Sequence, residues 1–139
     1  MNDPQWARKV EIDPEHGFRF DKPGQFILAY TVQKICFPHS SRIAARVEGK
    51  SSLARLGIGV HVTAPTIHAG FGFKHGVAVE ETAQPIQLEM FNISGLPVVL
   101  DIGMPVCQLI FEEVREVPLK GYQGRFNEQP VFATPGTSS

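Results

Sequence analysis

The sequence has only two cysteines, Cys36 and Cys107, which lie far apart and form no Cys-x-x-Cys pair. Zinc sites built from thiolates need clustered Cys and His ligands at short spacing, so we expect free buried thiols and no zinc. The chain also lacks an excess of charge, since 13 basic residues nearly balance 14 acidic ones. Strong positive charge is what binds a phosphate backbone, and we therefore expect no nucleic-acid polymer as a partner.

Long apolar runs are missing as well. No run approaches the roughly 18 residues that a membrane-spanning helix needs, which predicts a protein without a membrane partner. The first residues, 1–6, have neither the cationic head nor the apolar stretch of a secretory signal peptide. We therefore expect a cytoplasmic location.

What the sequence does have is short alternating apolar runs separated by 11 prolines and 13 glycines. This punctuation is typical of an all-β sandwich or barrel, and 139 residues suit one domain over 1–139. Residues 21–24 predict a type II turn with Gly24 at positive φ. The ends, about 1–15 and 120–139, are polar and turn-rich, and we expect them to be mobile. The predicted strands are 25–32, 42–47, 58–63, 86–92, 96–101 and 106–114, and one helical turn is predicted within 51–56.

Two features could carry chemistry. Residues 48–57 form a turn rich in Ser and Gly with Lys50 inside it, which could offer several donors to a phosphate. The alternative is a Ser-capped helical turn with an exposed lysine. Glu89 lies mid-strand between Leu88 and Met90, where a carboxylate usually faces solvent. If it instead points into a pocket near Arg55, it could hold a water molecule and take its proton.

The same residues carry a resemblance to a known family. Residues 48–57 read Glu-Gly-Lys-Ser-Ser-Leu-Ala-Arg-Leu-Gly and are followed by Val-His-Val-Thr-Ala at 60–64. Together they resemble the signature of the dCTP deaminase/dUTPase family, most closely its deaminases. Shorter matches at 22–28, 67–71, 86–92, 103–109 and 120–124 extend the resemblance over most of the chain.

The resemblance implies a distorted jelly-roll, or β-clip, barrel of the dUTPase-like type. It also implies a homotrimer with deoxynucleotide triphosphate sites at the subunit interfaces. In such a deaminase Glu89 takes a proton from the water that attacks C4 of cytosine, while Ser51 and Arg55 orient the water and stabilise charge. Mg²⁺ would be bound by the triphosphate and not by a protein cage. The implied nucleotide-binding residues are Lys50, Ser51, Ser52, Arg55, Thr63, Ala64, Tyr122 and Gln123.

Four departures from the family pattern bear on activity. His68 occupies the position of the dUTPase carboxylate that activates water, which argues against diphosphatase activity. Thr66 replaces an arginine of some deaminases. Residues 72–85 are additional and read as an extended hairpin at the site mouth or the trimer face. The longer N-terminal region usual in deaminases is also missing ahead of the first core strand.

These observations leave three functions. The leading one is a dCTP deaminase-like hydrolase that makes dUTP and ammonia. The main alternative is a non-catalytic nucleotide-binding, structural or regulatory protein on the same fold. A dUTP diphosphatase comes third because of His68. A direct catalytic role for His61 is not expected, since a single histidine in a strand is more often structural.

Overall fold

The computed structural model describes residues 9–60 and 64–116, whose regular structure is mostly β-strand. Three short helical segments accompany the strands: η1 (His39–Ser41), α1 (Ser51–Ala54) and α2 (Val79–Thr82). The strands are β1 (Phe18–Phe20), β2 (Gln25–Ile35), β3 (Ile43–Gly49), β4 (Ile58–Val60), β5 (Thr66–Ile67), β6 (Gln84–Asn92), β7 (Val98–Leu100) and β8 (Cys107–Glu113).

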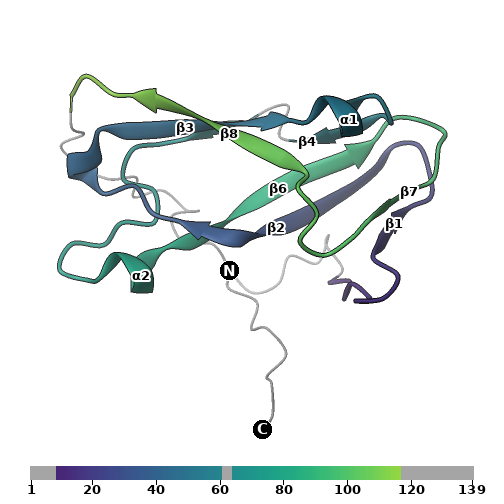
Figure 1. Ribbon diagram of the computed structural model, residues 1–139, viewed down its shortest axis with the longest axis horizontal. Coiled ribbons are helices and arrows are strands. Elements are labelled where there is room, and N and C mark those ends of the chain that lie inside the picture. The colour runs from purple at the N-terminus through teal and green to yellow at the C-terminus, as the bar shows by residue number, and fades with distance from the viewer. Residues whose placement is uncertain (1–8, 61–63, 117–139) are drawn as a thin grey trace, which may run out of the picture.

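The strands form two three-stranded antiparallel sheets and one two-stranded sheet. The order is β2-β6-β4 in one sheet, β5-β3-β8 in the second, and β1-β7 in the small one. The two larger sheets lie as layers, and the β1-β7 pair stands at the end of the molecule where α1 also lies (Figure 1). Within the described residues, β2 and β8 are therefore edge strands.

The hydrophobic core is formed by the facing sides of these sheets. Strand β6 contributes Ile86, Leu88 and Met90, each at most 6% exposed, and β3 contributes Ala45 and Val47. Side chains of a strand alternate between its two faces, so each of these sets lies on one side of its sheet. The remaining buried hydrophobic residues are Phe20, Phe37, Leu53, Ile58, Val60, Ile67, Val98 and Leu100.

The six predicted strands are present, with bounds that agree to within a few residues where both can be compared, whereas β1 and β5 were not predicted. The mostly β architecture is confirmed, whereas the jelly-roll topology and the trimer stay predictions. The positive φ predicted for Gly24 is confirmed at +76°, but the turn is shifted by one residue to 22–25, because the Gln25 N–H donates to the Lys22 carbonyl at 3.3 Å. Of the ends predicted to be mobile, residues 9–15 are described and exposed, and the rest lie outside the described residues.

The extended hairpin predicted over 72–85 is wrong. This stretch is a loop that leads into the helical turn α2 and then directly into β6. Thr82 is 4% exposed, and its hydroxyl lies 3.3 Å from the carbonyl oxygens of Ala78 and Val79. Gly72 packs so closely that a Cβ there would lie 2.8 Å from the Ile35 carbonyl. Contacts with the end of β2 thus replace the pairing of the segment with itself.

Candidate active site

The predicted phosphate-binding turn is the connection from β3 to β4, and it contains α1. Lys50 precedes the helical turn in an extended conformation (φ −100°, ψ 133°), and no side chain caps it. Ser51 is the first helical residue, so the alternative of a serine-capped turn is wrong. Within the described chain, the side chains of Lys50, Ser51, Ser52 and Arg55 make no hydrogen bond or ion pair. Both hydroxyls and both cations therefore remain available to a ligand.

The far end of this turn is fixed by a glycine. The N–H groups of Leu56 and Gly57 donate to the carbonyls of Leu53 and Ala54, each at 3.0 Å. Gly57 has φ +81°, a conformation that favours glycine. A Cβ at this position would also lie 2.5 Å from the Ser94 Cβ. The turn can therefore reach β4 only because residue 57 has no side chain.

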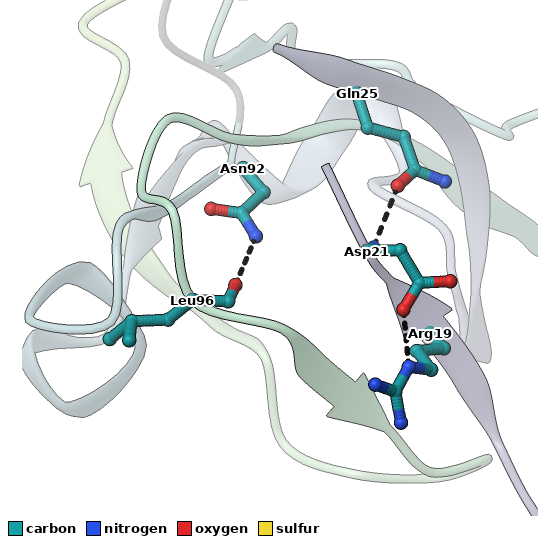
Figure 2. A network of polar contacts seen from close by, with 5 residues as sticks. All are labelled: Arg19, Asp21, Gln25, Asn92 and Leu96. Atoms are coloured by element: carbon teal, nitrogen blue, oxygen red, sulfur yellow. Dashed lines mark hydrogen bonds and ion pairs between the residues drawn. The ribbon is translucent and has the colours of Figure 1, made fainter. Parts of the chain in front are cut away.

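Asn92, the last residue of β6, links this turn to the rest of the sheet. Its side chain is 0% exposed, and its amide nitrogen donates to the Leu96 carbonyl at 2.9 Å (Figure 2). Its side-chain oxygen accepts the Ser94 N–H at 2.8 Å, and the Ser94 hydroxyl lies 2.7 Å from the Leu56 carbonyl. The strand end, the 93–97 loop and the α1 turn thus form one hydrogen-bonded unit.

The same loop is supported by the turn that precedes β2. The Gly24 N–H donates to the Asn92 carbonyl at 2.6 Å. Beside it, Arg19 forms an ion pair with Asp21, whose backbone N–H donates to the Gln25 side chain at 3.0 Å (Figure 2). The Gly24–Asn92 bond ties this turn to the end of β6, and the other two contacts link the end of β1 to the start of β2.

Glu89 lies on the outer face of β6, away from the core. It is opposite Leu28 of β2, and its side-chain oxygen Oε2 is shielded from solvent. Tyr30 and Gln87 lie on the same face, and the Gln87 amide donates to the Tyr30 hydroxyl at 2.8 Å. Burial raises the pKa of Tyr30, and the bond to Gln87 offsets part of that rise. The outer face therefore carries a partly buried polar cluster, defined here as Tyr30, Gln87 and Glu89.

An aromatic ring borders this cluster. Phe91 is paired with Gly59 of β4, and a Cβ on Gly59 would lie 2.2 Å from the tip of the Phe91 ring. The ring therefore lies over the glycine backbone. A flat apolar surface next to polar side chains is a common element of pockets that take an aromatic ligand.

The structure brings some of the predicted site residues together and separates others. Lys50, Ser51, Ser52 and Arg55 share one turn. Glu89 does not join them within one chain, because Ile58, just beyond that turn, pairs with Asn92, three residues further along β6. Three residues of strand span roughly 10 Å. Ala64 is exposed just before β5, as are Thr66 and His68 within and after it. Thr63, Tyr122 and Gln123, like His61, lie outside the described residues.

Several residues of this region were missed by sequence reasoning. Tyr30 and Gln87 could have been found, since alternation along each strand places Gln87 on the face of Glu89. The pairing of β2 with β6 that joins them is a tertiary property. Asn92 and Ser94 gave no signal beyond a polar residue at a strand end.

The two cysteines are free, as expected, but they are only partly buried. Burial nevertheless raises the pKa of the Cys107 thiol.

No cluster of three or more His, Cys, Asp or Glu side chains that could hold a metal occurs in the described residues. No helix in the described ranges is long and apolar enough to cross a bilayer.

Comparison with known sequences identifies related proteins. Residues 1–114 match a family described as dCTP deaminase-like. A dUMP-forming dCTP deaminase of Beutenbergia cavernae is 40% identical over 108 residues, which cover 78% of this chain and 49% of that protein. A dCTP deaminase of Rhodospirillum rubrum is 36% identical over 113 residues, covering 81% of this chain and 51% of that protein. The chain thus spans about half the length of the curated relatives it matches.

A solved structure supports the fold. The 2′-deoxycytidine 5′-triphosphate deaminase of Agrobacterium tumefaciens superimposes with a TM-score of 0.55 at 24% sequence identity. The match covers 84% of this chain and 30% of that one.

Proposed function

The chain belongs to the dCTP deaminase-like family, and from this premise we propose that it converts dCTP to dUTP and ammonia. The observation that carries the proposal is the α1 turn. It presents two serine hydroxyls and two cations whose side chains form no bond within the described chain. Such a set suits a triphosphate, because charge-assisted contacts to phosphate oxygens are among the stronger hydrogen bonds. The proposed phosphate ligands are Lys50, Ser51 and Ser52.

In the proposed reaction, Glu89 is the general base. It removes a proton from a water molecule while the water oxygen bonds to C4 of cytosine. Glu89 passes this proton to N3 of the ring. It then takes the remaining proton of the new C4 hydroxyl and gives it to N4, so that the C4–N4 bond breaks, ammonia leaves and the C4 carbonyl forms. Arg55 and Ser51 orient the water and stabilise the charge that develops. The shielded position of Oε2 supports this role, since a carboxylate screened from bulk water holds a single water molecule in place more readily.

Because one chain keeps Glu89 well apart from the α1 turn, we propose a site that is shared between subunits of a homotrimer. The α1 turn of one subunit would face the outer surface of β6 in its neighbour. Phe26 of β2 supports such an interface, since it lies on that outer surface and is 55% exposed. Sedimentation of the purified chain as a monomer at micromolar concentration would contradict this arrangement.

The proposed product is dUTP. Several relatives are named dUMP-forming, and dUMP would require a second hydrolysis that releases diphosphate. His68 stands where the resemblance places the carboxylate for that step, and its side chain is exposed. Mg²⁺ is proposed to be bound by the triphosphate.

A product assay tests the proposal. Purified protein with Mg²⁺ is incubated separately with dCTP, dUTP and their ribonucleotide forms, and products are resolved by anion-exchange chromatography. We expect dUTP and ammonia from dCTP, and a loss of about 10²- to 10⁴-fold in rate for Glu89→Gln. Glu112→Gln, an exposed carboxylate on β8, is the matched control and should retain the rate. Formation of dUMP from dCTP would refute the proposed product but not the deamination.

Triphosphate binding is tested apart from turnover. Lys50→Ala should weaken binding of a non-hydrolysable dCTP analogue by more than about 1 kcal/mol, because a charged contact is lost. Lys22→Ala, an exposed lysine in the turn before β2, is the control. Equal affinity in the two variants would contradict the assignment of Lys50.

The non-catalytic alternative is favoured by Thr66 and His68, which stand where the resemblance places an arginine and a carboxylate. It predicts that nucleotide binds without turnover of any substrate. Turnover of dCTP that is lost in Glu89→Gln would rule it out. A dUTP diphosphatase predicts dUMP from dUTP and no reaction with dCTP.

A further inference from the structure

Glu89 has one polar neighbour along its own strand on the outer face of the sheet. It is paired with Leu28 of β2, and the next residues on its side of β6 are Gln87 and Phe91. Of these three neighbouring side chains, only that of Gln87 can form a strong hydrogen bond. Within the described part of one chain, Gln87 is therefore the neighbour that can share a water molecule with Glu89.

The spacing of Gln87 and Glu89 suits such a shared water molecule. Residues two apart on one face of a strand have Cα atoms roughly 7 Å from each other. A water oxygen lies about 2.8 Å from each group that it bridges, so both side chains can reach it. Both side chains are partly buried, and Oε2 of Glu89 is shielded from solvent, which limits exchange of a bound water molecule with the bulk.

Tyr30 fixes the orientation of the Gln87 side chain. The Gln87 amide nitrogen donates to the Tyr30 hydroxyl at 2.8 Å, across the β2–β6 pair. Because the nitrogen and the oxygen of a carboxamide point in different directions, the Gln87 oxygen is turned away from Tyr30. That oxygen can accept two hydrogen bonds. Burial raises the pKa of Tyr30, so the hydroxyl is neutral at pH 7 and keeps this bond.

We propose that Gln87 is a further catalytic residue, whose side-chain oxygen accepts a hydrogen bond from the attacking water, and that Tyr30 is its positioning residue. This inference rests on the proposed deamination. With one O–H directed at Glu89 and the other at Gln87, a lone pair of the water oxygen points away from the sheet and toward C4 of cytosine. Gln87 takes no proton. The first proton goes to Glu89 as the O–C4 bond forms, and the second stays on the oxygen until Glu89 takes it.

Steady-state kinetics of the full-length protein with dCTP test the role of Gln87. Gln87→Met keeps the length of the side chain and removes the acceptor, so kcat should fall about 10- to 10²-fold through loss of the water's orientation. The affinity for a non-hydrolysable dCTP analogue should be unchanged, because Gln87 contacts the water and not the nucleotide. Gln108→Met, at an exposed position of β8, is the matched control and should retain kcat.

The possible outcomes separate this proposal from the proposed function. An unchanged kcat in Gln87→Met would overturn the role of Gln87 and leave the deamination standing. A loss of affinity for the analogue would also overturn it, in favour of a contact with the nucleotide. Absence of dCTP turnover in the wild type would overturn both proposals.

A double-mutant cycle tests Tyr30 and distinguishes positioning from a purely structural role. Tyr30→Phe removes the partner of the Gln87 amide, so kcat should fall about 2- to 10-fold. In the Gln87→Met background the same change should leave kcat unaltered, because Tyr30 acts through Gln87. Equal effects in the two backgrounds would refute the positioning role. An unchanged kcat in Tyr30→Phe alone would refute it too, and this readout does not depend on the Gln87 variant folding.

Discussion

The two faces of strand β6 differ in how far their side chains are buried and in the physical reason for that burial. The inner face carries Ile86, Leu88, Met90 and Asn92, none more than 6% exposed. The outer face carries Gln87, Glu89 and Phe91, which are partly exposed. The hydrophobic effect accounts for the burial of every inner-face side chain except that of Asn92. The burial of Asn92 is explained by its hydrogen bonds. Apolar burial does not account for a shielded carboxylate on the outer face, and for this reason the outer face is the one on which chemistry is proposed.

The comparison is tested most severely at the centre of the inner face, at Leu88, which is 1% exposed. Leu88→Ala should lower the free energy of unfolding by about 2 to 5 kcal/mol, because it removes buried methyl groups and leaves a cavity. Urea denaturation followed by circular dichroism gives the value. A loss below about 1 kcal/mol would mean that this side of the core repacks easily.

The next largest effect is expected where the inner face ends, at the Gly57–Ser94 contact. Gly57→Ala should cost about 1 to 3 kcal/mol for the left-handed backbone alone, and more because the new methyl group overlaps Ser94. Gly24→Ala is the matched control, since φ is +76° there but a Cβ at that position would meet nothing within 4 Å in the described structure. Equal losses in the two variants would show that the contact with Ser94 adds nothing.

On the outer face, Tyr30→Phe should cost about 0.5 to 1.5 kcal/mol through loss of the bond from Gln87. The raised pKa of Tyr30 means that the unfolded chain ionises first, from about pH 10 upward. Its contribution to stability is therefore complete below pH 10 and is lost as pH rises through the folded pKa. Denaturation curves from pH 8 to pH 11 should fall more steeply for the wild type than for Tyr30→Phe; parallel curves would contradict this.

The smallest change in stability is expected for Glu89→Gln, at less than about 0.5 kcal/mol. The amide keeps the shape of the carboxylate and removes a charge from a shielded position. Thermal denaturation measured beside the deamination assay completes the comparison, because stability should persist while turnover is lost. Unfolding of this variant would instead make Glu89 a structural residue.

Much of the fold could be predicted from the sequence because alternation is unambiguous where one face is apolar and the other polar. Residues 86–92 are such a case, and β6 carries Ile86, Leu88 and Met90 inward as the pattern indicates. Strand β2 is less clear, because Phe26 and Ile27 are both apolar. Alternation alone therefore does not show which of the two faces the core. The structure places Ile27 against the core and leaves Phe26 55% exposed.

Local features of the candidate site could be predicted from the sequence, but the arrangement of its residues could not. The helical turn after Lys50 follows from local sequence, and the outward position of Glu89 follows from alternation. The separation of Glu89 from Arg55 follows from the register of β4 on β6, which depends on tertiary pairing. The same holds for residues 72–85, where the close approach of Gly72 to Ile35 decided against a hairpin.

The irregular register of β2 has a consequence for solubility. Pairing with β6 is interrupted between Tyr30 and Lys34, where the Thr31 hydroxyl accepts the Ile86 N–H at 2.9 Å in place of a regular backbone bond. Among the described residues β2 is an edge strand, and an edge that is bent in this way offers a poor template for another strand. The bulge thus discourages sheet-to-sheet aggregation of a protein whose neighbouring edge residue, Val32, is apolar and 68% exposed.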